Sequence, residues 1–361
     1  MVSNKQSHVS PTDFQKKILD WFDHFGRKNL PWQFDKTAYR VWVSEIMLQQ
    51  TQASTVIPYF ERFMKRFPTM HALSSSIQDE ILHLWTGLGY YSRARNLHRS
   101  AQLTMQHFKG ELPNTLDELL TLPGIGRSTA GAILAIAFKQ KAAILDGNVK
   151  RVLTRVFGIT DWPGEKKVSD TLWNIAESLT PENRVEDYTQ AIMDIGATVC
   201  IRGKPQCEVC PLTTLCAARK LGIEKTLPHP KPKKKLPIRQ ATFLVLRHEK
   251  SVLLKKRPPT GIWGGLWSLP ELPDFLSHDA IHNYCQQHFK LSPQQVEMGQ
   301  PFRHTFSHFH LDMLPVFVTV IKKPTKIMED DQQIWYNLSK SQAVGLPAPV
   351  KKLLRNLLCH E

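Results

Sequence analysis

Long hydrophobic runs are scarce in this sequence of 361 residues. The longest one, 130–138, is about half of the roughly 20 residues that a bilayer crossing needs. The first fifteen residues contain no hydrophobic signal segment. These absences argue against a membrane-spanning protein and against a secreted one, so we expect a cytoplasmic location.

Cysteines and acidic residues are also few. The six cysteines could form three disulfides, but a chain of this size without an export signal does not need them, so reduced thiols or metal ligands are expected. The 47 lysines and arginines outnumber the 32 acidic residues and give a net charge of +15. This balance favours a polyanionic partner, and nucleic acid is the first candidate.

The charge is concentrated in a short segment near the middle of the chain. Residues 1–224 carry a net charge of +5 and residues 240–361 carry +4, whereas 225–239 carry +6 with no acidic residue. Four prolines in 225–239 forbid helix and favour an extended backbone. The segment is interpreted as an interdomain connector. Its lysines either lie along DNA phosphates or serve only to solvate a spacer.

The periodicity of apolar residues changes at this connector. Helical spacing before it predicts helices at 41–50, 54–66, 76–85, 92–107, 115–121, 128–138, 146–157, 168–179 and 187–200. Alternation after it predicts strands at 242–246, 252–254, 311–320 and 334–336, with helices at 278–289 and 349–358. The chain is therefore expected to have an all-α domain over 1–224 and an α+β domain over 240–361.

Four of the six cysteines fall within seventeen residues as a C-x6-C-x2-C-x5-C run, formed by Cys200, Cys207, Cys210 and Cys216. A structural zinc site usually takes two separated C-x2-C-like pairs, whereas a compact run with one such pair favours a [4Fe–4S] cluster. Zinc remains the alternative. The sequence does not separate a redox role of the cluster from a structural one.

A glycine-rich turn joins two predicted helices at LPGIGRSTA, residues 122–130. Gly124 and Gly126 let the backbone approach a ligand closely, and the free N–H groups at the start of the second helix favour an anion. The segment is interpreted as a helix-hairpin-helix phosphate site over about 115–138, although such a turn alone could be a simple connection.

These motifs together resemble the helix-hairpin-helix DNA glycosylase superfamily with an iron–sulfur loop. The segments VWVSEIMLQQTQ, WTGLGYYSRARNLH and HTFSHFHLD resemble, more narrowly, the MutY-type adenine DNA glycosylases, and the resemblance covers nearly the whole chain. It implies an enzyme that removes adenine mispaired with 8-oxoguanine or guanine in duplex DNA. A monomer in the bacterial cytoplasm, associated with the nucleoid, is expected.

Two carboxylates are the expected catalytic pair. Val41, Trp42 and Leu48 surround Glu45 on its predicted helix, and an apolar site raises the pKa of a carboxylic acid, so that it can donate a proton near neutral pH. A surface glutamate with its neighbours turned away is the alternative. Asp146 stands at a predicted helix start, where N–H groups favour its ionised form. Glycosidic cleavage through an oxocarbenium-like state needs one neutral acid and one anion.

The resemblance implies roles for further residues of the first domain. Asn148 supports the catalytic pair, and Gln190, Ser128 and Trp32 belong to the adenine pocket. Residues that contact DNA or fill the space left by the flipped base are Gln50, Thr51, Gly89, Tyr90, Gly124, Gly126 and Lys150. Ser128 replaces the lysine that endonuclease III-type relatives use for strand cleavage, so a glycosylase without lyase activity is expected.

The second domain resembles the Nudix fold. Gly265 and Glu271 match the start of a Nudix box, but the later acidic pairs are missing near Asp279, so magnesium-dependent hydrolysis is not expected. The resemblance assigns recognition of 8-oxoguanine to a loop formed by Phe306, Ser307 and His308. A polar hairpin turn without such a role is the alternative.

Two other functions compete with adenine removal. One is an endonuclease III-type glycosylase and lyase that acts on damaged pyrimidines, against which Ser128 and the second domain argue. The other is a non-catalytic iron–sulfur protein that binds DNA or transfers electrons. In that case the position of Glu45 would be incidental.

Overall fold

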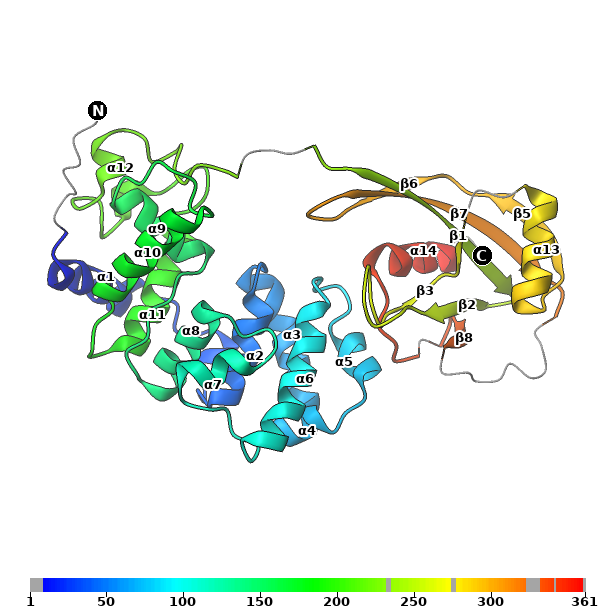
Figure 1. Ribbon diagram of the computed structural model, residues 1–361, viewed down its shortest axis with the longest axis horizontal. Coiled ribbons are helices and arrows are strands. Elements are labelled where there is room, and N and C mark those ends of the chain that lie inside the picture. The colour runs from blue at the N-terminus through cyan, green and yellow to red at the C-terminus, as the bar shows by residue number, and fades with distance from the viewer. Residues whose placement is uncertain (1–8, 232–234, 274–276, 323–331, 341, 360–361) are drawn as a thin grey trace. The chain divides into compact units, whose positions relative to one another are not determined.

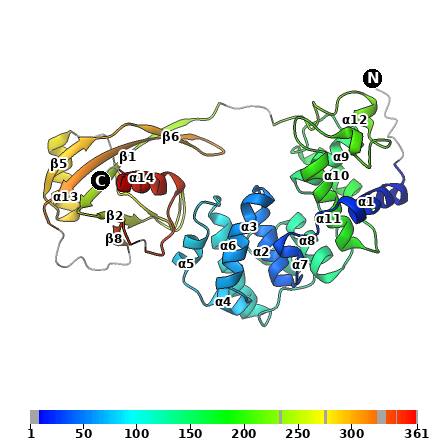
Figure 2. The same ribbon diagram turned by 180° about the vertical axis from the view of Figure 1, so that it is seen from behind.

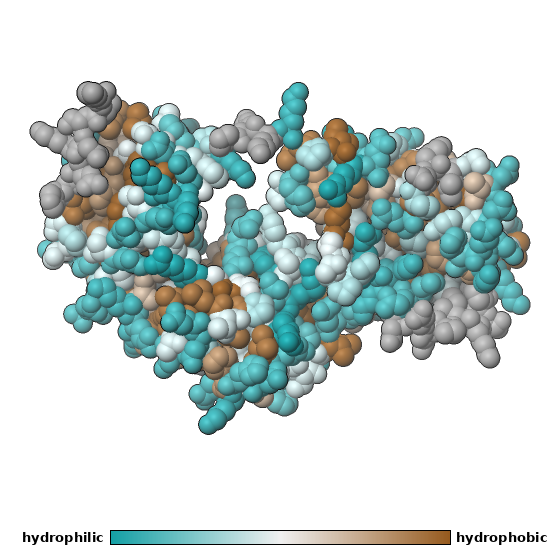
Figure 3. All heavy atoms as spheres, viewed as in Figure 1, coloured by the Kyte–Doolittle hydropathy of each residue, from teal (hydrophilic) through white to brown (hydrophobic). Residues whose placement is uncertain are grey.

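The computed structural model describes residues 9–231, 235–273, 277–322, 332–340 and 342–359. The chain divides into two compact units, of which the first comprises residues 1–75 and 96–233 and the second comprises 76–95 and 234–361 (Figure 1). Among the described residues, no helix is long and apolar enough to cross a membrane. Space-filling atoms show that hydrophilic side chains dominate the visible surface of both units (Figure 3).

The first unit is helical, as the spacing of apolar residues predicts. Its longer helices are α1 (Pro11–Phe25), α2 (Ala38–Leu48), α3 (Ala53–Arg66), α6 (Ser92–His107, from Asn96 onward), α7 (Leu116–Thr121), α8 (Arg127–Phe138), α9 (Gly147–Val156), α10 (Lys166–Leu179) and α11 (Val185–Asp194). Short segments are η1 (Pro31–Gln33), α4 (Met70–Ser74), η3 (Cys207–Val209) and α12 (Ala217–Lys220).

The single helix predicted at 187–200 corresponds to two elements of the structure. Helix α11 ends at Asp194, and residues Ile195–Val199 continue as a π-helical turn, η2. Short π segments inside or after α-helices frequently occur at functional sites. Gly196 in η2 lies so close to α9 that a Cβ on it would be 2.6 Å from the Cβ of Asn148. This approach brings η2 against α9.

The second unit is built on a mixed sheet of eight strands. The strands are β1 (Ile238–His248), β2 (Ser251–Lys256), β3 (Trp267–Ser268), β4 (Glu271–Leu272), β5 (Pro293–Met298), β6 (Phe302–Thr305), β7 (His310–Val320) and β8 (Gln333–Asn337). The main path runs β3-β2-β1-β7-β5, with β4 on β1, β6 on β7 and β8 on β2. Strands β1 and β7 are parallel, with Leu244 opposite Val316.

Two helices complete this α+β unit, as predicted. Helix α13 (His278–Phe289) contributes Ile281 and Cys285 to a core that also contains Leu244 and Val318. Both ribbon views show α13 beside β5 and α14 (Ala348–Cys359) as a separate helix of the unit (Figure 2). Apolar faces of helix and sheet thus meet in one core, which is the usual solution for this fold class.

The division of the chain differs from the expected boundary in one respect. Residues 76–95, which include α5 (Gln78–Leu84), group with the second unit. The reason lies in specific contacts: the Asp79 carboxylate accepts hydrogen bonds from Lys256 at 3.0 Å and from the Trp267 indole at 3.1 Å. The Arg95 guanidinium donates to the Gly264 carbonyl at 2.7 Å. Sequence spacing predicts the helix but not its partner.

Candidate active site

A cavity of about 970 Å³ lies in the first unit between α2, α8, α9, α11 and η1. Eight residues that the sequence assigned to catalysis, the adenine pocket or the wedge line this cavity: Trp32, Glu45, Gln50, Thr51, Ser128, Asp146, Asn148 and Gln190. They come from positions up to 158 residues apart in the chain. The fold therefore gathers residues of all three groups around one space.

Glu45 lies half-buried on α2, among apolar residues that form the core side of this helix. Burial raises the pKa of its carboxyl group to about 8, and the negative charge of Asp146 adds to the increase. Both causes penalise the charged form. A neutral carboxylic acid at physiological pH can donate a proton, so the expectation for the pKa of Glu45 is confirmed.

Asp146 caps helix α9, as the sequence predicts. One of its carboxylate oxygens accepts from the Val149 N–H at 2.8 Å, and the other accepts from the Asn148 side-chain amide at 3.2 Å. These bonds lower the pKa, but burial is the larger effect, and the pKa of Asp146 is raised from its usual value. The N–H groups of the helix start thus favour the ionised form, as expected, while burial acts in the opposite direction and is the larger effect.

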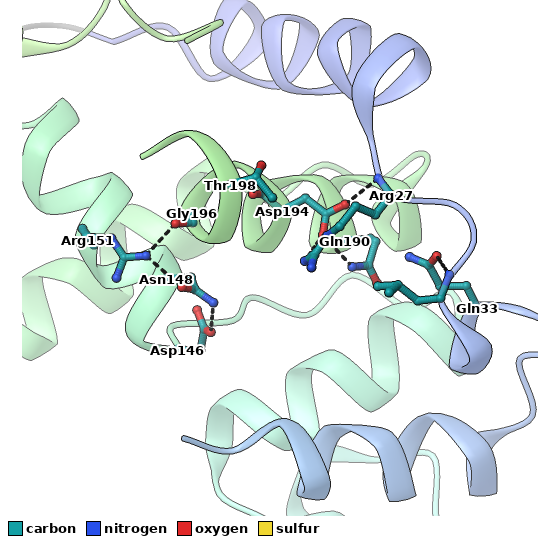
Figure 4. A network of polar contacts seen from close by, with 10 residues as sticks. Arg27, Gln33, Asp146, Asn148, Arg151, Gln190, Asp194, Gly196 and Thr198 are labelled. Carbon is teal, nitrogen blue, oxygen red and sulfur yellow. Dashed lines mark hydrogen bonds and ion pairs between the residues drawn. The ribbon is translucent and has the colours of Figure 1, made fainter. Parts of the chain in front are cut away.

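Asn148 joins the catalytic pair to a second layer of contacts. Its side-chain oxygen accepts from the Arg151 guanidinium at 2.8 Å, and the same guanidinium donates to the Gly196 carbonyl at 2.6 Å (Figure 4). The guanidinium also donates to the Cys200 carbonyl at 2.7 Å. A planar guanidinium with several fixed donors suits such a junction. The start of α9 is thereby tied to η2 and to the beginning of the cysteine loop.

Ser128 holds the wall of the cavity beside Asp146. Its hydroxyl oxygen accepts from the Leu145 N–H at 3.1 Å, directly before the capping aspartate. In the same helix, a Cβ on Gly131 would lie 2.2 Å from the Ala143 carbonyl oxygen, so only glycine permits this approach. The segment that leads to Asp146 therefore packs closely against helix α8.

The glycine turn between α7 and α8 has the predicted geometry. Gly124 has φ +85°, and the N-cap Gly126 has open space where a Cβ would be. The Gln49 amide donates to the Gly124 carbonyl at 3.3 Å and to the Thr129 hydroxyl at 3.2 Å, which ties the end of α2 to the turn. Lys150 lies half-buried on α9. Gly124, Gly126 and Lys150 lie outside the lining of the cavity, and their contact with the DNA backbone stays a prediction.

Two expected wedge residues have left-handed backbone conformations. Gln50 has φ 57° and lies exposed at the end of α2, whereas Tyr90 has φ 49° and is 48% exposed. Non-glycine residues in this region carry a conformational cost that is common at functional sites. Gly89 and Tyr90 belong to the second unit, where the Arg93 guanidinium donates to the Gly89 carbonyl at 3.2 Å and stacks over the Tyr90 ring.

The four clustered cysteines are half-buried free thiols on one loop. The buried Arg155 organises this loop by donating to the Cys200 sulfur at 3.2 Å and to the Ile201 carbonyl at 2.9 Å. Burial raises the pKa of Cys210 to about 12, and negative charge on Cys200 contributes to this increase. Cys285 lies buried in the core of the second unit, and the Cys359 side chain is outside the described residues.

The expected reader loop forms the tip of the hairpin between β6 and β7. The Phe306 N–H donates to the Phe309 carbonyl at 2.9 Å, and the two rings stack with centroids 4.5 Å apart. Ser307 and His308 are both exposed at this tip, with the hydroxyl oxygen and the imidazole Nδ1 3.4 Å apart. The stacked aromatic rings hold the hairpin in place, and the two polar side chains are exposed to a ligand.

The remnant of the Nudix box has a structural partner. The Glu271 carboxylate accepts from the Arg257 guanidinium at 3.0 Å. Within the part of the chain that the structure describes, no three histidine, cysteine, aspartate or glutamate side chains form a site for a single metal ion. Glu271 therefore has a cation from the chain itself as its partner.

Sequence reasoning missed three residues of the site. These are the charged residues Arg27, Arg151 and Asp194, which take part in the hydrogen bonds of the site. The first two also line the cavity. Asp194 is fully buried and accepts from Arg27. A signal was present, since buried aspartate on an apolar helix face requires a partner, but nothing in the sequence indicates which residue provides it.

Comparisons with known proteins agree with this architecture. Residues 43–178 match the HhH-GPD superfamily of base excision DNA repair proteins, and residues 241–356 match the NUDIX domain. The chain is 41% identical over 343 residues to the adenine DNA glycosylase of Buchnera aphidicola subsp. Acyrthosiphon pisum, covering 95% of this chain and 97% of that relative. The human adenine DNA glycosylase is 36% identical over 360 residues, covering 83% of this chain and 66% of the relative.

Solved structures resemble the first part of the chain. A thermostable thymine-DNA glycosylase is 28% identical with a TM-score of 0.54, covering 58% of this chain and 97% of that one. Endonuclease III in a non-covalent complex with DNA is 22% identical with a TM-score of 0.51, covering 60% and 100%. Because the sequence identity to endonuclease III is only 22%, this similarity establishes the fold alone.

Proposed function

We propose the substrate and mechanism of this chain from one premise: it belongs to the family of adenine DNA glycosylases, base excision repair enzymes that act on N-glycosyl bonds in DNA. The substrate that we propose is adenine mispaired with 8-oxoguanine, or with guanine, in duplex DNA. One observation carries the mechanism: Glu45 and Asp146 line the same cavity, and the pKa of Glu45 is about 8.

The proposed reaction uses the two carboxyl groups in different ways. Neutral Glu45 donates its proton to N7 of the flipped adenine, which then leaves with the electrons of the C1′–N9 bond. The carboxylate of Asp146 stabilises the positive charge that develops on the sugar, as in other glycosidic cleavages. Water adds to C1′ and returns a proton to Glu45. Asn148, held by Arg151, keeps the Asp146 carboxylate oriented.

We propose that the enzyme releases the base without cutting the strand. A lyase needs an amine that attacks the sugar to form a Schiff base. Ser128 offers no amine, and its hydroxyl oxygen accepts a backbone N–H instead. This argues against the endonuclease III-type alternative.

Flipping adenine out of the duplex costs stacking energy, so residues must fill the gap that it leaves. We propose Gln50, Thr51 and Tyr90 for this role, with Gly89 next to the tyrosine. The strained, exposed backbone of Gln50 and Tyr90 supports this assignment. Trp32 and Gln190 would then enclose the flipped base, while the turn at Gly124 and Gly126, with Lys150, would contact the DNA backbone.

The second unit is proposed to recognise 8-oxoguanine. Adenine is a normal base, so the base opposite it must identify the damage. Ser307 and His308 are exposed at the tip of a hairpin that the stacked rings of Phe306 and Phe309 hold in place. Pairing of Glu271 with Arg257 supports a recognition domain without nucleotide hydrolysis.

We propose that Cys200, Cys207, Cys210 and Cys216 hold one [4Fe–4S] cluster. Four half-buried thiols on one loop form the set of four cysteine ligands that a [4Fe–4S] cluster takes. When bound, the cluster supplies iron–thiolate bonds that close the loop. The guanidinium of Arg155, which contacts the Cys200 sulfur, would offset part of the negative charge.

A single assay tests the proposed activity. Duplexes with adenine opposite 8-oxoguanine would be incubated with wild-type protein and with the Glu45→Gln and Asp146→Asn variants, then analysed with and without alkali. We expect alkali-dependent strand breaks from the wild type and losses of about 10²–10⁴-fold for Glu45→Gln. Breaks without alkali would indicate a lyase, and undiminished excision by Glu45→Gln would refute the mechanism.

We further propose that the enzyme works as a monomer in the bacterial cytoplasm.

A further inference from the structure

A buried carboxylate lies beside the cavity and outside the catalytic pair. Asp194, the last residue of α11, is fully buried. Its Oδ1 accepts from Arg27 Nε at 3.0 Å, from Arg27 Nη2 at 2.6 Å and from Gln190 Nε2 at 3.1 Å, and its Oδ2 accepts from the Arg27 backbone N–H at 2.9 Å. Figure 4 shows Asp194 between these two side chains.

This arrangement decides which end of the Gln190 amide faces a ligand. The amide group of glutamine has almost the same shape when it is rotated by 180°, but donor and acceptor then change places. A carboxylate paired with arginine only accepts hydrogen bonds, so the NH2 group of Gln190 must point to Asp194. The carbonyl Oε1 is left for the cavity that Gln190 lines.

Purines differ at the position that such an acceptor can distinguish. Adenine carries an exocyclic amino group, which is a donor, whereas guanine and hypoxanthine carry a keto oxygen at the same position, which is an acceptor. A carbonyl oxygen of Gln190 can accept from the amino group but not from the keto oxygen. The wrong base would leave two buried acceptors facing each other without a proton.

We propose that Asp194 is a positioning residue that sets the purine specificity of the pocket, because it fixes Gln190 as a hydrogen-bond acceptor. This inference rests on the proposed function and adds to it the reason why 6-oxopurines are rejected. Asp194 acts through Gln190 and does not touch the base. Its partner Arg27 donates three hydrogen bonds to the buried carboxylate, and the Thr198 hydroxyl donates to the Asp194 backbone carbonyl at 2.8 Å, which holds the helix end in place.

The test compares adenine with hypoxanthine, each placed opposite 8-oxoguanine in the same duplex. Both bases present N7 to Glu45, so the ratio of their single-turnover excision rates reports on the exocyclic group. Asp194→Leu removes the carboxylate that accepts from the NH2 group of Gln190, and the side-chain amide of Gln190 can then rotate. We expect the adenine-to-hypoxanthine ratio to fall by about tenfold or more, which corresponds to one misplaced buried hydrogen bond.

A double variant distinguishes this role from a merely structural one. In Asp194→Leu combined with Gln190→Glu, both carboxylate oxygens are acceptors, so rotation cannot change what the base meets. We expect this variant to recover most of the wild-type ratio, although its Asp194 contacts remain absent. Thermal melting of each protein would show the folded fraction, and the ratio itself is independent of that fraction.

Two control variants separate other causes. Asp187→Leu makes the same change in charge on α11, at a residue that pairs with Arg184 at 2.9 Å, and should leave both rates unchanged. Arg27→Lys keeps a cation beside the carboxylate of Asp194, which therefore remains an acceptor for Gln190, and this variant should preserve the ratio even if both rates fall.

Four outcomes would overturn the inference: an unchanged ratio in Asp194→Leu, loss of both activities in that variant, no recovery in the double variant, or an equal fall in Arg27→Lys. If the wild type fails to excise adenine opposite 8-oxoguanine, the proposed function itself is wrong. Wild-type excision together with an unchanged ratio in Asp194→Leu refutes only the role of Asp194.

Discussion

Acidic residues are placed differently in the two units of the molecule. In the first unit, Glu45 and Asp146 line one cavity, and burial raises the pKa of both. In the second unit, Glu271 accepts from Arg257, and two hydrogen bonds from Arg303 lower the pKa of Asp312. Desolvation raises the pKa of a carboxyl group, and for Asp146 the charge of Arg151 offsets only part of this increase, whereas in the second unit the paired guanidinium of Arg303 is the dominant effect on Asp312.

Asp194 shows that burial alone does not make a carboxylate catalytic. It lies in the same unit and is fully buried, but Arg27 contacts it from two directions. The comparison therefore depends on the partner of each acid and not only on its depth. The following predictions test this difference, from the largest expected effect to the smallest.

The pH dependence of excision tests the protonated state of Glu45. Because its pKa is about 8, the neutral acid predominates below that pH and is lost above it. We expect the single-turnover rate to fall about tenfold per pH unit above pH 8, and about a hundredfold by pH 10. DNA binding measured at each pH provides the control. A rate that stays constant from pH 7 to pH 10 would contradict a proton donor with a raised pKa.

Gly196→Ala tests the support of the catalytic pair. The added Cβ would lie 2.6 Å from the Cβ of Asn148, so α9 or η2 must move. A displacement of about 1 Å near the reacting groups can cost up to about a hundredfold in rate. We expect excision to fall by about tenfold to a hundredfold while the protein stays folded in a melting experiment. Full activity would show that the contact between η2 and Asn148 is not needed.

Combined Ser307→Ala and His308→Ala substitutions test the reader hairpin. Removal of two exposed polar side chains should lower the preference for 8-oxoguanine over guanine by about tenfold, because roughly one hydrogen bond is lost. Excision of adenine opposite guanine should remain, since the cavity of the first unit is unchanged. The ratio of the two rates is the measurement, and an unaltered ratio would remove the hairpin from recognition.

The smallest effect is expected for Glu271→Gln in the second unit. Glu271 is exposed and its ion pair with Arg257 lies near the surface, so the free energy of unfolding should change by about 0–1 kcal/mol. Excision and its dependence on magnesium should not change. A large loss of activity would show that the acidic remnant has a catalytic role and would end the contrast between the units.

Much of the fold follows from local patterns. Helical spacing predicts α2, α3, α6 and α8 to within a few residues, and alternation predicts the positions of β1, β2, β7 and β8. The strands β3 to β6 were not predicted, because β3 and β4 have only two residues each and β5 and β6 contain few apolar residues. Residues 76–95, which include the predicted helix 76–85, were expected in the first domain but belong to the second unit, since hydrogen bonds such as that from the Trp267 indole to Asp79 are invisible in a sequence.

The sequence by itself determined the chemical groups of this protein: one acid among apolar neighbours, one helix-capping aspartate, a glycine turn and four clustered cysteines. Only the tertiary structure decided how these groups behave. It surrounds Asp146 so closely that burial outweighs capping, and it places Asp194 against Gln190 and Arg27. The physical reason is that a pKa and a hydrogen-bond direction depend on water lost and partners gained, and residues distant in sequence determine both.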